Sequence, residues 1–222
     1  MSEDTAGNPG ELAERRAAVA ELGAEVRALV EAVVSTEADS AELRGCAERV
    51  RAVTEALRRR RRTRGTLASV DDLPAGIRMY NPVSGEGNPY APPMHIELDG
   101  GVAEGACTLG LSYEGPPTYG HGGVSAMLLD QILGGAVVGS GRPGMTTMLA
   151  LRYRRPVPLH TPLRVRGEVT EVNGRRTRAR GEIVTAGDPD RILVAAEAEF
   201  TSINGEQALR LFGDAARQGA RP

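Results

Sequence analysis

The sequence predicts an α+β domain, an antiparallel sheet wrapped around one long helix, with an N-terminal helical hairpin extension. Three observations support this prediction. The first quarter of the chain has helical apolar spacing, the part after residue 93 consists of short strand-like segments, and one apolar run of helical length interrupts those segments. We therefore expect the extension over residues 1–70, the sheet domain over 71–205 and a C-terminal tail over 206–222.

The N-terminal segment has the pattern of two amphipathic helices. Residues 11–64 contain no proline, and Asp39 or Ser40 can cap a second helix that continues through Leu57. We expect this hairpin to serve in oligomerisation or docking and to contribute no residue to a catalytic site. In the first helix, apolar residues recur every seven positions, with others three positions later: Leu12, Val19, Leu22, Val26, Leu29 and Val33.

Strand signals begin after Pro93. The stretch "HIELDGGVAEGACTLGL" predicts a strand, an Asp-Gly-Gly turn and a second strand. Asn173-Gly174 and Gly187-Asp188 stand where tight turns are needed between later strands. We expect those later strands over residues 147–153, 163–172, 176–186 and 192–203.

Composition excludes several classes of function. A net charge of −2 argues against a general nucleic-acid binder, although the run from Arg58 to Arg62 could contact phosphates or an anionic membrane surface. Cys46 and Cys107 lack metal-ligand spacing, so we expect free thiols and no metal site. The polar, acidic N-terminus and the absence of a long uncharged apolar run predict a cytoplasmic protein without membrane attachment.

The stretch "TYGHGGVSAMLLDQILGGAVV" poses a chemical question because Asp130 is the single carboxylate in an apolar helix. An ionised carboxylate inside a core costs several kcal/mol unless a partner compensates it. Asp130 therefore either faces solvent or a subunit interface, caps a neighbouring backbone, or acts in a site as a general base or an orienter of water. The preceding His121-Gly122-Gly123 can supply free amides at a helix start, which stabilise negative charge on a substrate oxygen.

Spacing decides how these two features could cooperate. His121 and Asp130 are nine residues apart, which is about 13 Å along a helix. One chain therefore cannot bring both to the same carbonyl. If both serve one reaction, two antiparallel helices in a twofold dimer must provide the amide and the acid to each site.

At these residues a family resemblance appears. The stretches "GHGGVSAMLLDQILG", "GMTTMLALRYRRPVPLHTPLRV" and "NPYAPPMHIEL" resemble the PaaI-like thioesterases of the hotdog fold, in the branch with Gly-Pro-Pro before His-Gly-Gly. The resemblance covers residues 81–203. It implies a sheet wrapped around a long helix, a homodimer or homotetramer, hydrolysis of acyl-CoA thioesters, and no cofactor.

Carried over by position, the resemblance implies roles for individual residues. The amide of Gly122 would polarise the thioester carbonyl, His121 would shape the turn, and Asp130 of the other subunit would act as general base or nucleophile. We also expect Gly123 and Thr147 to contact substrate. Independently of the resemblance, the arginine pair Arg154 and Arg155 either forms a solvated strand end or binds the phosphates of coenzyme A, which an arginine pair suits.

Two further positions complete the comparison with the family. Thr146 matches a family Ser or Thr that positions the water or the acid. Many members have Asn six residues before the His, where this chain has Gly115. The Gly-Pro-Pro branch commonly lacks this Asn, so the difference concerns substrate or rate.

Two other functions compete with hydrolysis. The first is a non-hydrolytic acyl-CoA binding or regulatory protein on the same fold, against which Asp130 and Thr146 argue because a binder needs no acid there. The second is a hotdog hydratase or dehydratase, which should place a His beside the acid. Here the nearest His is held in the His-Gly-Gly turn.

Overall fold

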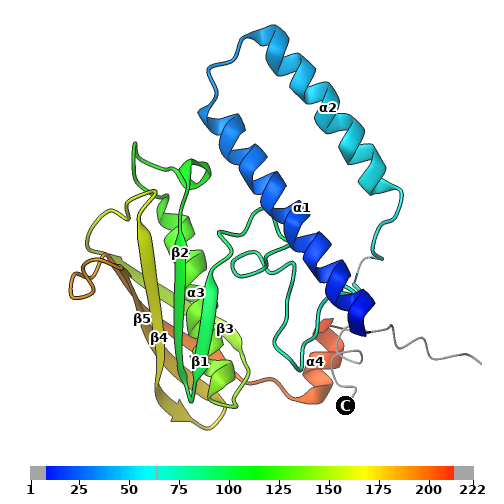
Figure 1. The fold of residues 1–222 in the computed structure, drawn as a ribbon. Coiled ribbons are helices and arrows are strands. Elements are labelled where there is room, and N and C mark those ends of the chain that lie inside the picture. Colours follow the sequence, from blue (N-terminus) through cyan, green and yellow to red (C-terminus); the bar gives the residue numbers. More distant parts are fainter. Residues whose placement is uncertain (1–8, 64, 213–222) are drawn as a thin grey trace, which may run out of the picture.

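A six-stranded antiparallel sheet and one long helix form the centre of the structure, a computed structural model that describes residues 9–63 and 65–212 (Figure 1). The strand order is β1-β2-β4-β5-β6-β3, and the predicted α+β class is confirmed. Gly174, with φ of 57°, forms the predicted tight turn between β4 and β5. The strands are β1 (His95–Asp99), β2 (Val102–Thr108), β3 (Met145–Tyr153), β4 (Pro162–Asn173), β5 (Arg176–Thr185) and β6 (Val194–Thr201).

The main core lies between this sheet and helix α3 (Gly122–Gly139). Side chains alternate between the two faces of each strand, so Val165, Ile183 and Phe200 point from three strands toward the helix and are buried. Each large aliphatic side chain buried there stabilises the fold by about 1.5–3 kcal/mol. The helix contributes Ser125, Leu128, Leu129, Ile132, Leu133, Ala136 and Val137.

One face of α3 is not covered by the sheet, although all six strands contact the helix. Asp130, Gln131 and Gly134 are half-buried, and Val138 is 54% exposed. Among the residues that the structure describes, α3 is the one helix with the length and apolarity of a membrane span. Its packing on the sheet explains these properties, which core helices share.

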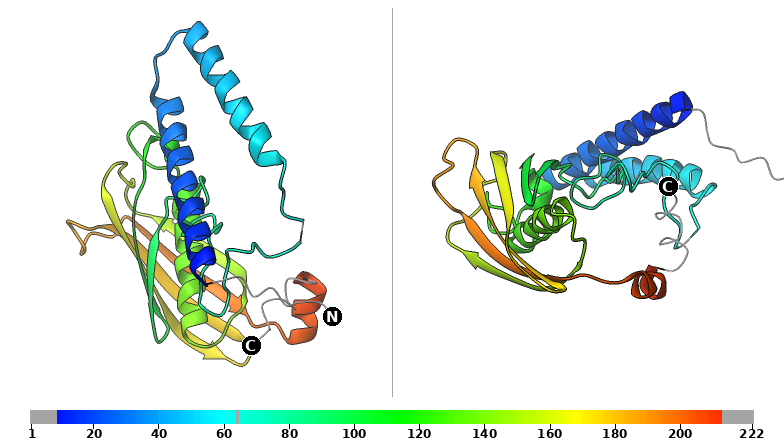
Figure 2. Two further views of the ribbon diagram at one scale, coloured as in Figure 1. Left: turned by 45° about the vertical axis from the view of Figure 1, so that its right-hand side comes forward. Right: turned by 90° about the horizontal axis from the view of Figure 1, so that it is seen from below.

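The N-terminal extension consists of α1 (Pro9–Ser35) and α2 (Ser40–Arg58), as predicted. Asp39 caps α2, because its Oδ1 accepts hydrogen bonds from the amides of Ala41 (2.7 Å) and Glu42 (3.0 Å). Figure 2 shows the sheet on one side of α3 and the extension on the other.

Apolar contacts cross the predicted domain boundary near residue 70. A second apolar cluster joins α1 to the segment that follows α2, and its buried members are Ala68, Val70 and Met79. Val19 and Ala20 of α1 pack against them. The first part of the predicted tail forms helix α4 (Gly205–Phe212), and residues 213–222 lie outside the described part of the chain.

Candidate functional site

The His-Gly-Gly turn starts α3, as predicted. His121 is the N-cap, and its Nδ1 accepts a hydrogen bond from the amide of Gly123 at 3.0 Å. The backbone of His121 is held in turn, because its amide donates to the carbonyl of Tyr113 at 2.9 Å. Tyr113 ends the short 3₁₀ helix η1 (Leu111–Tyr113). His121 therefore shapes the turn, and the Gly123 amide is already used for capping rather than being free for substrate.

The amide of Gly122 remains available. Over residues 9–63 and 65–212, it donates no hydrogen bond. The hydroxyl of Tyr153 donates to the Gly122 carbonyl at 2.9 Å, and a Cβ at position 122 would lie 3.3 Å from the Tyr153 ring. A free amide at a helix N-terminus stabilises an oxyanion. Tyr153, which sequence analysis did not select, fixes the direction of this turn.

Gly115 has a steric explanation. A Cβ at this position would lie 2.8 Å from the Cα of His121, closer than real Cβ contacts. The Gly115 amide donates to the carbonyl of Tyr119 at 2.9 Å, which folds the segment tightly against the turn. The asparagine that many family members have at this position therefore has no room in this chain.

Asp130 and Thr146 meet, as the resemblance implied. The Thr146 hydroxyl donates to Asp130 Oδ1 at 3.0 Å. Thr146 pairs with Phe200 of β6, and directly paired residues share a face of the sheet, so both side chains point toward α3. The hydroxyl fixes one carboxylate oxygen and leaves the other free to accept a proton.

A groove of about 880 Å³ contains this pair. Its floor is the open face of α3, and its walls come from β1, the segment 76–94, β6 and helix α1. Helix α1 therefore lines the same groove as the pair that the resemblance implied for catalysis. From α1 the lining residues are Arg16, Ala17 and Ala20.

Asn81 and Gln131 complete the groove and were missed at the sequence level. The Asn81 side-chain amide donates to Gln131 Oε1 at 2.9 Å. Asn81 Oδ1 also accepts from the amides of Val83 (2.8 Å) and Ser84 (3.0 Å). The segment 76–94 is thereby fixed beside Asp130. In the sequence, the Gln that directly follows Asp130 was the signal that could have indicated this contact.

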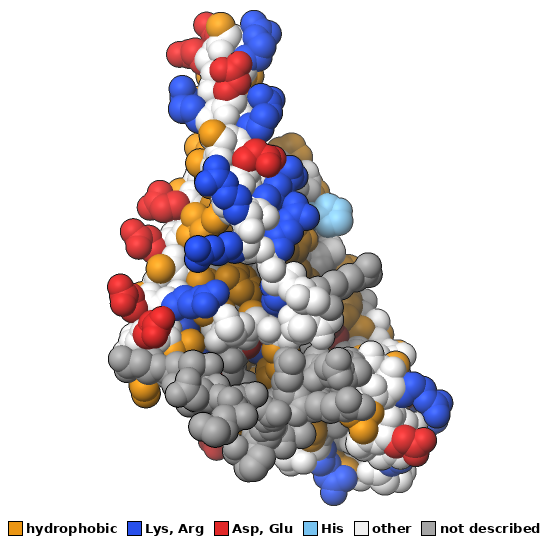
Figure 3. Space-filling model, turned by 90° about the vertical axis from the view of Figure 1, so that its right-hand side faces the viewer, with side chains coloured by type: hydrophobic (Ala, Val, Ile, Leu, Met, Phe, Trp, Pro, Cys, Tyr) orange, Lys and Arg blue, Asp and Glu red, His pale blue; other side chains and the backbone are white. Residues whose placement is uncertain are grey.

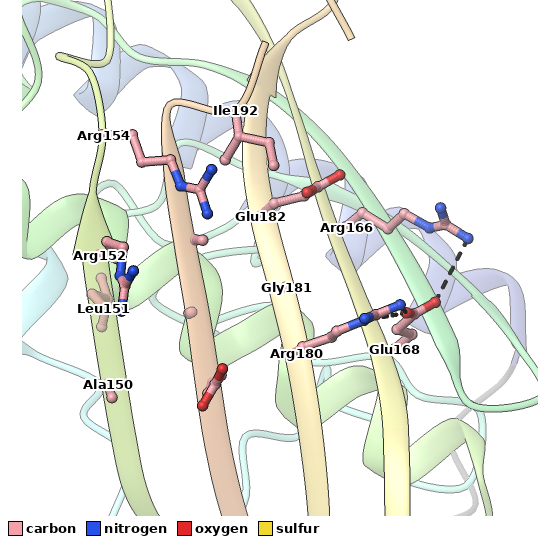
Figure 4. Close-up of a pocket in the computed structure, with 13 residues that line it drawn as sticks. Ala150, Leu151, Arg152, Arg154, Arg166, Glu168, Arg180, Gly181, Glu182 and Ile192 are labelled. Atoms are coloured by element: carbon pink, nitrogen blue, oxygen red, sulfur yellow. Dashed lines mark hydrogen bonds and ion pairs between the residues drawn. The ribbon is translucent and has the colours of Figure 1, made fainter. Parts of the chain in front are cut away.

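The remaining predicted binding residues do not reach this groove. A β-bulge falls at Thr147, whose hydroxyl donates to the carbonyl of Glu199 at 3.0 Å. Arg155 donates to the carbonyl of Ile192 at 3.0 Å. Arg154 lies with Arg152 on the sheet face opposite α3 (Figure 4). A bulge shifts the alternation of side chains, which sequence periodicity alone does not reveal.

The outer sheet face around Arg154 has mixed charge. Arg166 and Arg180 both pair with Glu168, and Glu182 lies next to them (Figure 4). Arg154 itself makes no ion pair with another described residue. Because acidic side chains alternate with the arginines, this face does not present the uniformly positive surface that the phosphates of coenzyme A would favour.

A sheet packed on one long helix, with a free amide at the helix start and an acid in its middle, defines a hotdog protein. The thioesterase superfamily model matches residues 119–192. A solved structure, protein RHA08564, described as a thioesterase superfamily protein, is 34% identical; the alignment covers 82% of this chain and 94% of that chain, with a TM-score of 0.73. The chain belongs to the thioesterase superfamily.

A curated relative is also similar. The mouse (Mus musculus) acyl-coenzyme A thioesterase THEM4 is 28% identical over 100 residues, which are 45% of this chain and 43% of that protein. The chain therefore matches less than half the length of this relative. The family match includes the helix start, Asp130 and Thr146.

Proposed function

We propose that the protein hydrolyses acyl-CoA thioesters, with Asp130 as the acid–base residue and the amide of Gly122 as the oxyanion donor. The single observation that supports this most directly is the hydrogen bond from Thr146 to Asp130 inside the groove. The relative THEM4 is named for the same reaction. Membership in the thioesterase superfamily limits the candidate functions to those carried out by proteins of this fold.

The chemistry follows from the groups in place. Asp130 accepts a proton from water while the water oxygen attacks the thioester carbon, and a donor such as the Gly122 amide holds the resulting oxyanion. The C–S bond then breaks, and the sulfur leaves as coenzyme A and takes up a proton. A direct attack by Asp130, giving an anhydride that water opens, uses the same groups.

We further propose that two subunits build each site. The rise of an α-helix separates the start of α3 from Asp130 by about 13 Å, so both cannot contact one carbonyl from a single chain. In the described residues, β3 pairs only with β6 and leaves its other edge open. On this edge strand Met145, Met148 and Tyr153 are 40 to 56% exposed. An open apolar edge favours pairing with a second copy.

Pairing of β3 with its twofold mate would extend the sheet across both subunits. It would bring the two α3 helices side by side on the same face of that sheet, with Thr146 and Asp130 near the junction. Each Gly122 would then face the Asp130 of the other subunit, giving two equal sites. A tetramer would add a second contact between such dimers.

The two alternative functions are less well supported. A non-hydrolytic binder needs neither the acid nor the hydroxyl that orients it. A hydratase needs a His beside the acid, whereas His121 Nδ1 is occupied by the Gly123 amide. The cytoplasmic location and the absence of nucleic-acid and membrane binding stay predictions from composition.

Asp130→Asn tests the assignment. Loss of a general base lowers kcat by about a hundredfold or more, while the isosteric amide preserves packing. The measurement is release of free thiol from acyl-CoA esters by the variant and the parent. Asp190→Asn is the matched control, because Asp190 is exposed on the loop between β5 and β6. Equal turnover by a folded Asp130→Asn protein would remove Asp130 from the mechanism.

A further inference from the structure

The groove continues beyond Asp130 along α3 toward α1. Its floor follows one side of the helix at one-turn intervals, through Asp130, Gly134 and Val138. Gly134 has no side chain to block the floor next to the acid. A substrate whose carbonyl is held at Asp130 can therefore extend along the groove in this direction.

The walls of this extension are apolar. Two methionines and three other large side chains contribute, and the volume of about 880 Å³ lies within the range of small-molecule sites. Such a lining accepts aliphatic chains and offers few polar partners. The residues are Met79, Met94, Ile96, Leu98 and Phe200.

Two arginines at this part of the groove have acidic neighbours. Arg16 faces Asp72, with Nη2 and Oδ2 4.0 Å apart, which is beyond hydrogen-bond distance, and Nη2 is buried without a hydrogen-bond partner among the described residues. Arg78 faces Asp71, with Nε and Oδ2 3.3 Å apart. An uncharged chain contacts the apolar side chains of this wall and leaves Nη2 of Arg16 without a partner, whereas a chain with a polar end would supply one.

Helix α1 closes the groove opposite α3 with small side chains. Ala17 and Ala20 line it, next to the stem of Arg16, whose Nε donates to the carbonyl of Val70 at 2.8 Å. Ala20 also packs into the second apolar cluster, whereas Ala17 is exposed to the groove. The small volume of these two residues leaves the space in front of α1 open.

The position of α1 is fixed along its length. Arg27 donates to the carbonyls of Glu86 (2.8 Å) and Asn88 (3.1 Å). Glu31 accepts from the amides of Leu111 (2.8 Å) and Ser112 (3.2 Å), which start the 3₁₀ helix before the His-Gly-Gly turn. The helix is therefore tied both to the segment that covers the groove and to the segment that leads to Gly122.

We propose that α1 is the far wall of the acyl-chain site and that Ala17 and Ala20 set the longest unbranched aliphatic chain that fits. The proposal rests on the proposed function of the same groove. It assigns substrate selection to a helix outside residues 119–192, the part of the chain that matches the thioesterase model.

The test compares Ala17→Phe with Ala18→Phe. Both residues are exposed on α1, but only Ala17 lines the groove. For each full-length protein, kcat/KM is measured with butyryl-CoA and dodecanoyl-CoA. We expect Ala17→Phe to lower the ratio of dodecanoyl to butyryl values by at least about tenfold, since excluding methylenes from an apolar pocket has effects of this size. Ala18→Phe should leave the ratio as in the parent.

The outcomes separate this proposal from the proposed function. An unchanged ratio in a folded, active Ala17→Phe protein would overturn the role of α1 and leave the hydrolase assignment intact. If the parent hydrolyses neither ester, the hydrolase assignment fails. The role of α1 is then tested by binding: the ratio of dodecanoyl-CoA to butyryl-CoA affinity is compared between Ala17→Phe and the parent. If Ala17→Phe does not fold, Ala17→Leu makes the same comparison with a smaller side chain.

Discussion

Helices α1 and α2 lie next to each other in the chain and have very different surroundings. Helix α1 packs on the segment 66–94 and on η1, whereas α2 has no buried residue. Figure 3 shows hydrophobic side chains between charged ones over the extension. Four apolar residues of α2 are 40 to 55% exposed: Leu43, Val50, Val53 and Leu57. Together with the exposed Cys46 they recur at alternating intervals of three and four residues, so they lie on one face of the helix.

The difference between the two helices shows what an amphipathic pattern does and does not specify. In α1, Val19 and Val26 of the seven-residue pattern are half-buried, but Leu22, Leu29 and Val33 are exposed. Besides the apolar contacts of Val19 and Ala20, docking depends on polar contacts of α1 and on the close approach at Gly23, which hydrophobic spacing does not detect. A pattern indicates that a face needs a partner without identifying the partner.

The largest expected difference concerns thiol reactivity. Burial raises the pKa of Cys107 in β2 to about 11, whereas Cys46 is exposed on α2. The thiolate is the reactive form, so at pH 8 only about one Cys107 in a thousand is ionised. We expect a maleimide to label Cys46 at least about a hundredfold faster than Cys107. Labelling of Cys107 should accelerate as pH rises toward 11.

Mass spectrometry of the modified peptides measures both rates in the native protein. Labelling in denaturant, where both thiols are accessible, is the control. Protection of Cys46 in the native protein would contradict an uncovered α2 and would show that another chain covers its apolar residues.

A smaller effect, of opposite sign in the two helices, is expected for glycine substitutions. A Cβ at Gly23 would overlap the Glu86 carbonyl oxygen and lie 2.9 Å from the Cα of Gly87. At Gly45 the nearest atom to a Cβ is the flexible end of Arg49, at 3.9 Å. Gly45→Ala should therefore stabilise α2 by up to about 1 kcal/mol through helix propensity. Gly23→Ala should lower the free energy of unfolding by about 1–3 kcal/mol through overpacking. The same gain in helix propensity offsets part of this loss.

Urea unfolding of both variants measures the two free energies of unfolding. Equal stabilisation by both alanines would mean that α1 does not lie against residues 86 and 87 in solution. The account of α1 as a wall of the groove would then lose its structural basis.

Sequence alone predicted the architecture better than the site. The strands and α3 were predictable because alternation and apolar length determine which faces are buried, and the Asp130–Thr146 pair followed from the family resemblance. The use of the Gly123 amide by His121 and the bulge at Thr147 depend on local geometry that spacing does not encode. The contribution of Ala17 to the groove depends on how α1 docks, and alanine has no pattern that marks it.

Complementation between two inactive variants tests the central claim, that each site combines Gly122 of one subunit with Asp130 of the other. Asp130→Asn removes the acid, and Gly122→Val places a branched side chain at the donor amide, against the Tyr153 ring. A heterodimer has one site with both defects and one intact site, so a statistical mixture should recover about a quarter of the parental sites. The circular dichroism spectrum and the molecular size of each single variant, compared with those of the unsubstituted protein, are the controls for folding. Hydrolysis at about that level, well above either variant alone, is the predicted result, and purified heterodimers no more active than the variants would contradict the shared site.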